Sequence, residues 1–156
     1  MSQSDIEIRV MTIDDYDGVY SVWLNTPGMG LNSTDDSREG IEKYLKRNPE
    51  TCFAAVCDGR IVGTVLSGHD GRRGYIQHLA VLPEYRNRKI ATNLVENAMS
   101  ALEREGITKV TLVAFTKNEI GNAFWEKMGF TIRHDLYYRN KSIQKLEYHP
   151  NPYRNE

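Results

Sequence analysis

The alternation of apolar and polar residues along the chain predicts an α+β protein. Stretches with a period of two residues, which are typical of half-buried strands, alternate with stretches of helical period. From the N-terminus the predicted order is strand, helix, helix, three strands, helix, strand, helix and closing strands. The predicted strands cover residues 4–10, 52–57, 60–67, 75–81 and 109–115, with a further strand from Phe130, and the predicted helices cover 12–24, 34–47, 90–105 and 118–128.

Turn residues between these segments predict how the strands pair. Asp58-Gly59 is a two-residue hairpin signal, and the polar run 70–74 separates the next two strands. Gly106 and Gly129 follow the last two predicted helices, where glycine is favoured because it adopts the left-handed conformation without a Cβ clash. We therefore predict a mixed, mostly antiparallel central sheet flanked by about four helices.

Length, composition and charge narrow the classes of protein. The chain has 156 residues, of which 40% are hydrophobic, enough for one core. We expect one domain over residues 1–147 and a polar, proline-broken tail over 148–156. A formal net charge of −1 gives no attraction for nucleic acid. No apolar run approaches the ~18 residues of a membrane span, and the polar start is unlike a signal peptide. We expect a cytoplasmic protein without nucleic-acid or membrane partners, and a homodimer is compatible with the sequence.

Cysteine and histidine positions give no sign of a disulfide or a metal site. Cys52 and Cys57 lie five residues apart in one predicted strand, so their side chains point to opposite faces and serve as structural thiols. The four histidines are scattered, and none forms a Cys/His cluster with metal-ligand spacing. No metal is expected.

The segment from Leu79 to Glu96 carries the clearest chemistry in the sequence. An apolar strand ends at a turn that leads into an amphipathic helix, and Arg86, Arg88 and Lys89 stand where that helix begins. The first turn of a helix has backbone N–H groups without intrahelical partners, and the helix dipole adds positive potential. Such a place binds anions such as a pyrophosphate, although a solvated, charged helix start has the same pattern.

Together with residues 118–130, this segment resembles the GNAT superfamily of N-acetyltransferases, nearest to its ribosomal-protein N-terminal acetyltransferase branch. The superfamily's cofactor loop reads Gln/Arg-x-x-Gly-x-Gly/Ala, and residues 86–91 read Arg-Asn-Arg-Lys-Ile-Ala. The resemblance runs from about residue 8 to 138. It implies the GNAT fold, acetyl-CoA as cosubstrate, and a small-molecule or peptide amine as acceptor. It also implies cofactor contacts from Leu79, Ala80, Val81, Arg86, Asn87, Arg88, Lys89, Ile90, Ala91, Thr92, Asn118 and Trp125.

Lys89 departs from this pattern, because the superfamily usually has glycine there. Glycine allows a positive φ, which costs other residues on the order of 1 kcal/mol. We expect Lys89 to adopt an ordinary negative φ. The loop amides would then still face the pyrophosphate, while the lysine side chain turns to solvent or reaches a phosphate.

The second part of the resemblance is Asn118 to Phe130, which matches Asn-x-x-Ala-x-x-Phe/Leu-Tyr-Glu-Lys-x-Gly-Phe. Asn118 falls on the cofactor-contacting asparagine, and it is also an ordinary helix cap. Trp125 replaces a tyrosine whose hydroxyl can protonate the departing CoA thiolate, which an indole cannot do. Trp125 either lines the cofactor channel or packs in the core. Solvent, Tyr137 or Tyr138 is then left to supply the proton.

A general base can be sought on the strand before the cofactor loop. Gln77 and His78 are adjacent, so in a regular strand they face opposite sides and only one looks into a given cleft. His78 is a candidate base, because histidine changes charge near neutral pH. It can equally be a structural residue, with solvent taking the proton. We expect direct attack of the amine without a covalent intermediate, since no Cys-His or Ser-His-Asp arrangement is visible.

Acceptor recognition is expected from the first two helices, the loop over residues 25–33 and the segment 134–138, as the resemblance implies. Asp35, Asp36 and Glu39 either attract a cationic amine or serve as ordinary acidic residues at a helix start. A second function stays open because of Lys89 and Trp125: an acyl-CoA-binding regulatory or interaction module with little turnover. A Rossmann domain is disfavoured, since no glycine-rich loop follows the first strand.

Overall fold

A central sheet with helices on both faces forms the fold in the computed structural model, which describes residues 5–154. Its elements are β1 (Ile6–Val10), the 3-10 turn η1 (Ile13–Asp15), α1 (Tyr16–Leu24), α2 (Arg38–Arg47), β2 (Phe53–Cys57), β3 (Arg60–His69), β4 (Gly74–Val81), the 3-10 turn η2 (Pro83–Tyr85), α3 (Ile90–Arg104), β5 (Val110–Thr111) and α4 (Glu119–Lys127). Ser4, where the first strand was predicted to begin, and the last two residues of the predicted tail lie outside the described residues.

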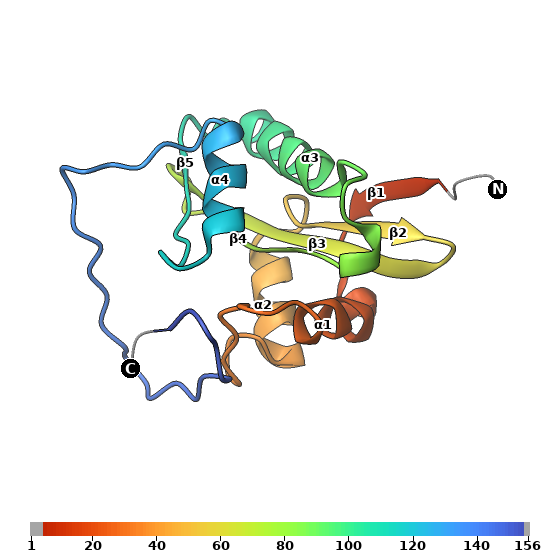
Figure 1. Ribbon diagram of the computed structural model, residues 1–156, viewed down its shortest axis with the longest axis horizontal. Coiled ribbons are helices and arrows are strands. Elements are labelled where there is room, and N and C mark those ends of the chain that lie inside the picture. The colour runs from red at the N-terminus through yellow and green to blue at the C-terminus, as the bar shows by residue number, and fades with distance from the viewer. Residues whose placement is uncertain (1–4, 155–156) are drawn as a thin grey trace.

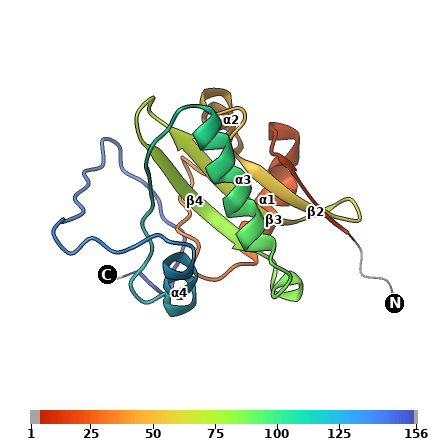
Figure 2. The ribbon, with the colours of Figure 1, turned by 90° about the horizontal axis from the view of Figure 1, so that it is seen from above.

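The five strands follow one another across the sheet in the order β1-β2-β3-β4-β5. The first four pair antiparallel, while β5 runs parallel to β4. Helices α1 and α2 lie on one face and α3 lies on the other, with α4 next to β4 and β5 (Figures 1 and 2). This arrangement confirms the predicted α+β fold with a mixed, mostly antiparallel sheet.

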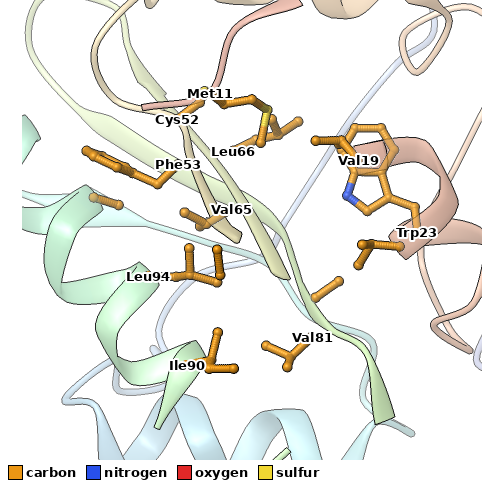
Figure 3. Packing of buried hydrophobic residues seen from close by; sticks show 14 of the residues in the cluster. Met11, Val19, Trp23, Cys52, Phe53, Val65, Leu66, Val81, Ile90 and Leu94 are labelled. Atoms are coloured by element: carbon orange, nitrogen blue, oxygen red, sulfur yellow. The ribbon is translucent and has the colours of Figure 1, made fainter. Parts of the chain in front are cut away.

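The hydrophobic core occupies both faces of the sheet. On one face, Val19 and Trp23 of α1 are at most 1% exposed, and on the other, Ile90 and Leu94 of α3 are at most 2% exposed. Figure 3 shows these two groups on opposite sides of the strands. α3 contributes many side chains to the core, because its apolar residues recur every three or four positions and so lie on one face of the helix.

Turns predicted from glycine positions form as expected. Asp58 and Gly59 both have positive φ, +49° and +78°, which the tight β2–β3 hairpin requires. Gly106 and Gly129 have φ of +81° and +92° and end α3 and α4. Cys52 and Cys57 are buried and free.

The C-terminal part of the sheet is shorter than predicted. β5 covers two residues where a strand over 109–115 was expected, and no strand follows α4 within residues 5–154. The chain from 131 to 147 runs away from the sheet (Figure 1), and Ile132, Leu136 and Ile143 are 67%, 61% and 100% exposed. Alternating apolar residues make a strand only where a neighbouring strand accepts the backbone hydrogen bonds, and that neighbour is not encoded locally.

Residues 147–154 return to the body of the protein and contact the segment before α2. Tyr148 forms an antiparallel bridge with Asn32, and the His149 N–H donates to the Leu31 carbonyl at 3.0 Å. The stretch predicted as a tail is thus attached along residues 29–33. Among the described helices, none is long and apolar enough to cross a membrane.

A partly buried ion pair joins β1 to the start of α1. The Arg9 guanidinium donates two hydrogen bonds to the Asp15 carboxylate, each 2.8 Å, and the Thr12 N–H donates to the same carboxylate at 2.9 Å. Asp15 is only 8% exposed. The hydrogen bond from Arg9 lowers the pKa of Asp15 below its ordinary value, against an opposing effect of burial. The charged form of Asp15 is therefore favoured in the folded protein.

We predict that Asp15→Asn lowers the free energy of unfolding at pH 7 by roughly 1.5–3 kcal/mol, the usual value of hydrogen bonds to a charged group. Because the folded-state pKa lies below the unfolded value of about 3.9, this stability is present above pH 4 and is lost as the pH falls through the folded-state pKa. Urea unfolding of both proteins at pH 7 and pH 3 measures the difference, which should shrink at pH 3.

The matched control is Asp17→Asn on the same helix. The Asp17 side chain is 90% exposed and its contact with Arg38 is 3.4 Å, so we expect a change within about 0.5 kcal/mol. If Asp15→Asn lowered the free energy of unfolding equally at pH 7 and at pH 3, the stability could not come from the charged form of Asp15.

Candidate functional site

The edge of β4 that faces β5 is open over most of its length. β5 pairs only with Gly74 and Tyr75, so from residue 76 to 81 this edge has no strand partner among residues 5–154. On the other edge, the Leu82 N–H donates to Val62 of β3 at 2.9 Å. Because N–H groups alternate in direction along a strand, those of Val81 and Leu79 point to the open edge. Backbone donors are thus available there to a ligand.

A β-bulge interrupts β4 at His78. Thr64 of β3 pairs with Ala80, and Leu66 pairs with Gln77, so β4 has one more residue than β3 over this interval. His78 has a φ of +52°, in the left-handed region. For a residue with a Cβ this conformation costs roughly 1–2 kcal/mol, and such strained residues concentrate at functional sites.

The bulge changes which side chains share a face. The prediction that Gln77 and His78 face opposite sides is wrong, because the extra residue breaks the regular alternation of the strand. Gln77 lines a cavity together with Tyr44 of α2. The His78 ring packs edge-on against Trp23 of α1, with 4.9 Å between ring centroids. Both side chains therefore lie on the face covered by α1 and α2 (Figure 1).

His78 is paired with an acidic side chain from the segment before α2. Its Nε2 lies 2.7 Å from Oδ1 of Asp36, and the two side chains are 12% and 7% exposed. Asp36 does not cap α2, since Ser37 accepts the hydrogen bond from the Gly40 N–H at 3.0 Å. It also does not stand free to attract an amine from solvent. Sequence reasoning named His78 and Asp36 separately and missed the pair, because 42 residues separate them.

The loop between η2 and α3 contains two left-handed residues, Asn87 with φ +64° and Lys89 with φ +62°. The expectation of an ordinary φ at Lys89 is wrong. Its carbonyl accepts the first helical hydrogen bond, from the Asn93 N–H at 3.0 Å, so Lys89 is the residue at which the chain turns into the helix. The lysine side chain at this turn is exposed, so the left-handed backbone causes no clash in the core.

The start of α3 has the donors needed to bind an anion. The N–H groups of Ile90, Ala91 and Thr92 belong to the first turn, where helical N–H groups have no intrahelical acceptor. Ile90 is buried and anchors the turn to the core. The side chains of Arg86, Asn87, Arg88 and Lys89 are exposed around it. Backbone donors surrounded by positive charge suit a pyrophosphate.

The two predicted cofactor residues of α4 have clear structural contacts. Asn118 caps the helix, with its Oδ1 accepting from the Gly121 N–H at 3.0 Å. Trp125 is partly buried and packs edge-on against Phe124 and Phe130, with centroid distances of 5.1 and 5.2 Å. Trp125 thus belongs to an aromatic cluster that packs on the core.

The two tyrosines predicted as proton donors lie outside the cavities found beside the sheet. Tyr137 and Tyr138 are 91% and 69% exposed, on the segment that runs away from the sheet. A cavity of about 490 Å³ instead brings Tyr44 and Tyr75 next to Gln77. Burial raises the pKa of Tyr44. Tyr44 was not predicted as a site residue, because its helical spacing with Ile41 and Leu45 indicates only a buried position.

Comparison with known proteins places this geometry among acetyltransferases. The model of the acetyltransferase (GNAT) family matches residues 17–130. An acetyltransferase of Photorhabdus laumondii is 33% identical over 149 residues, covering 92% of this chain and the whole of that protein. In structure, the chain is similar to the PaiA N-acetyltransferase of Thermoplasma acidophilum in complex with coenzyme A (TM-score 0.73, 20% identity, 83% of this chain and 91% of that one). It is also similar to the aminoglycoside N-acetyltransferase AAC(6′)-Iy in complex with CoA (TM-score 0.68, 18% identity, 90% and 98%).

We predict that Lys89→Gly stabilises the protein. Glycine relieves the left-handed strain, while its greater freedom in the unfolded chain offsets part of the gain, so we expect about 0.5–1 kcal/mol and a melting temperature higher by roughly 1–4 °C. Lys89→Ala, which removes the charge but keeps the strain, is the control and should leave the melting temperature unchanged. Equal effects of the two substitutions would argue that charge, not backbone conformation, matters at this position.

Proposed function

Because the chain belongs to the acetyltransferase (GNAT) family, we propose that it transfers an acetyl group from acetyl-CoA to a primary amine by direct attack, without a covalent enzyme intermediate. The observation that carries the proposal is the bulged strand β4, which has an unpaired edge and is followed, after η2 and a short loop, by the N-terminus of α3. One continuous stretch of chain thus offers donors for both ends of a long, anionic cofactor.

In this proposal the cofactor lies along β4. The pyrophosphate accepts hydrogen bonds from the first-turn amides of α3, from Ile90 to Thr92, and the exposed basic side chains around them add attraction. The pantetheine chain then pairs with the open edge of β4 at the Val81 N–H, and the Leu79 N–H, which also lacks a strand partner, is left for the acetyl group. This brings the acetyl group to the bulge, beside His78.

The reaction needs a positioned amine, a base and an oxyanion donor. The amine nitrogen attacks the thioester carbonyl carbon, the C–N bond forms, and the C–S bond breaks. The Leu79 N–H is the donor that we assign to the developing oxyanion, and His78 takes the proton that the amine loses. CoA leaves as a thiolate. We assign solvent as the source of the proton that the thiolate then receives. Trp125 is not an acid, and Tyr137 and Tyr138 are exposed on a segment that runs away from the sheet.

The acceptor would approach from the face covered by α1 and α2. The cavity of about 490 Å³ opens there between Tyr44 of α2 and the first residues of β4, next to His78 in the chain. A cavity of this size is compatible with an amine on a small molecule or at the N-terminus of a peptide.

The two cysteines support direct attack. Cys52 is 1% exposed, and burial raises the pKa of its thiol to about 12, so a thiolate is scarce at neutral pH. Cys57 is 3% exposed. Neither side chain is available to form an acetyl-enzyme.

We predict that Ala91→Pro weakens CoA binding by roughly 10- to 100-fold, because it removes one amide donor to the pyrophosphate and disfavours the helical conformation of the residue before it. Isothermal titration calorimetry with CoA measures the dissociation constant. Ala91→Gly keeps the amide and is the matched control.

Arg88→Ala should weaken CoA binding by less than about fivefold, since this exposed guanidinium, which stacks on Tyr85 at 5.2 Å, contributes only a solvent-screened charge. If Arg88→Ala weakened CoA binding more than Ala91→Pro did, side chains rather than backbone amides would hold the phosphates. Absence of saturable binding at millimolar CoA would overturn the cofactor assignment.

We predict that the protein releases CoA thiol from acetyl-CoA when primary amines are added. The assay follows free thiol with a panel of polyamines, aminoglycosides, amino acids and N-terminal peptides. Initial rates should follow ternary-complex kinetics, and the double variant Cys52→Ala, Cys57→Ala should retain its turnover per folded molecule.

Two results would count against this function. Ping-pong kinetics, or loss of turnover in the double cysteine variant with CoA binding intact, would indicate a covalent intermediate. Tight CoA binding without turnover on any amine of the panel would favour the second function, an acyl-CoA-binding regulatory module.

A further inference from the structure

Hydrogen bonds and a ring contact hold both His78 and Asp36 in place. Trp23 donates from Nε1 to the Thr64 hydroxyl at 3.0 Å, and that hydroxyl donates to the His78 carbonyl at 3.0 Å. The Trp23 ring meets the His78 ring edge-on at 85°. The backbone and the ring of His78 are therefore fixed by the same tryptophan, and the left-handed φ aims the ring at Asp36.

Asp36 is held as firmly as its partner. One carboxylate oxygen, Oδ1, faces Nε2 of His78, and the other, Oδ2, accepts from the Asn32 N–H at 2.8 Å. The Tyr16 hydroxyl donates to the Asp36 carbonyl. An ionised carboxylate is an acceptor only, so the proton of a neutral His78 lies on Nε2, between the two side chains. The lone pair of the imidazole is then on Nδ1.

Within residues 5–154, the one ion pair of His78 is with Asp36. The titratable groups around the pair are Tyr16, which stacks on Tyr20, and Asp35, which accepts from the Asn32 side chain, with Arg38 and Glu39 beyond Tyr16. Thr64 and Trp23 are neutral. Asp36 is therefore the group that decides the tautomer of the ring.

We propose that Asp36 is a positioning residue that holds His78 with Nε2 protonated and Nδ1 free, so that Nδ1 receives the proton of the acceptor amine. This inference rests on the proposed acetyl transfer. The carboxylate also stabilises the imidazolium that forms when the proton arrives, without leaving its place. Strain at the bulge and burial of the pair serve this orientation, because a ring free to rotate would present either nitrogen.

An ion pair that only joins β4 to the segment before α2 would have the same contacts. The test must therefore separate this structural role from the positioning role. Asp36→Asn keeps the shape and one hydrogen bond but allows the other tautomer. We expect kcat/KM to fall roughly 10- to 100-fold, mainly in kcat, with the dissociation constant for CoA unchanged. The pH–rate profile of Asp36→Asn should also differ in shape from that of the unaltered protein, because the imidazolium loses its negative partner.

The second variant is His78→Gln, whose amide can still bond Asp36 but cannot act as a base. It should lose roughly 10²-fold or more in kcat and lose the acid limb altogether, even where Asp36→Asn folds poorly. Asp17→Asn, on the exposed surface of α1, is the control for removing a carboxylate. Circular dichroism melting gives the folded fraction by which each rate is divided.

The outcomes are distinct. Unchanged kcat and pH profile per folded molecule in Asp36→Asn, or retained turnover in His78→Gln, would overturn the inference and leave the proposed function standing. Absence of CoA release by the unaltered protein with every amine would overturn the proposed function, and the inference with it.

Discussion

The bulge in β4 is the constraint on which the rest of the site depends. One extra residue between two paired positions bends the strand and places His78 in a left-handed conformation. Beyond this point β4 has no neighbour on its β5 side, so its backbone donors remain available. The bulge therefore turns a ring toward a buried carboxylate beside an edge of backbone donors that the short β5 leaves unpaired.

The stability of this strained residue comes from the core around it. Trp23 is almost fully buried, and its ring and its N–H both contribute to holding His78, the N–H through Thr64. The cost of one left-handed residue is small compared with the burial of a tryptophan and the leucines and valines packed near it. A site that demands an unfavourable backbone is tolerated because its neighbours are well packed.

Sequence reasoning succeeded where the determinants were local. The hairpin at Asp58-Gly59 and the helix ends at Gly106 and Gly129 follow from residues next to one another, and helical periodicity predicted α3 correctly. It failed where the determinant lay far along the chain. The bulge at His78 is a relation between two strands, and the left-handed φ of Lys89 belongs to the connection that joins η2 to α3. Likewise, the strand expected from Phe130 has the right alternation but no neighbour.

The attachment of residues 147–154 to the segment before α2 divides the site into two separately supported halves. The cofactor contacts that we propose lie in one continuous stretch, from β4 into α3, whereas Asp36 follows a segment that pairs with residues 147–149. A substitution at Tyr148 or Asn32 would therefore loosen the support of the segment before Asp36 while leaving the proposed phosphate site unchanged.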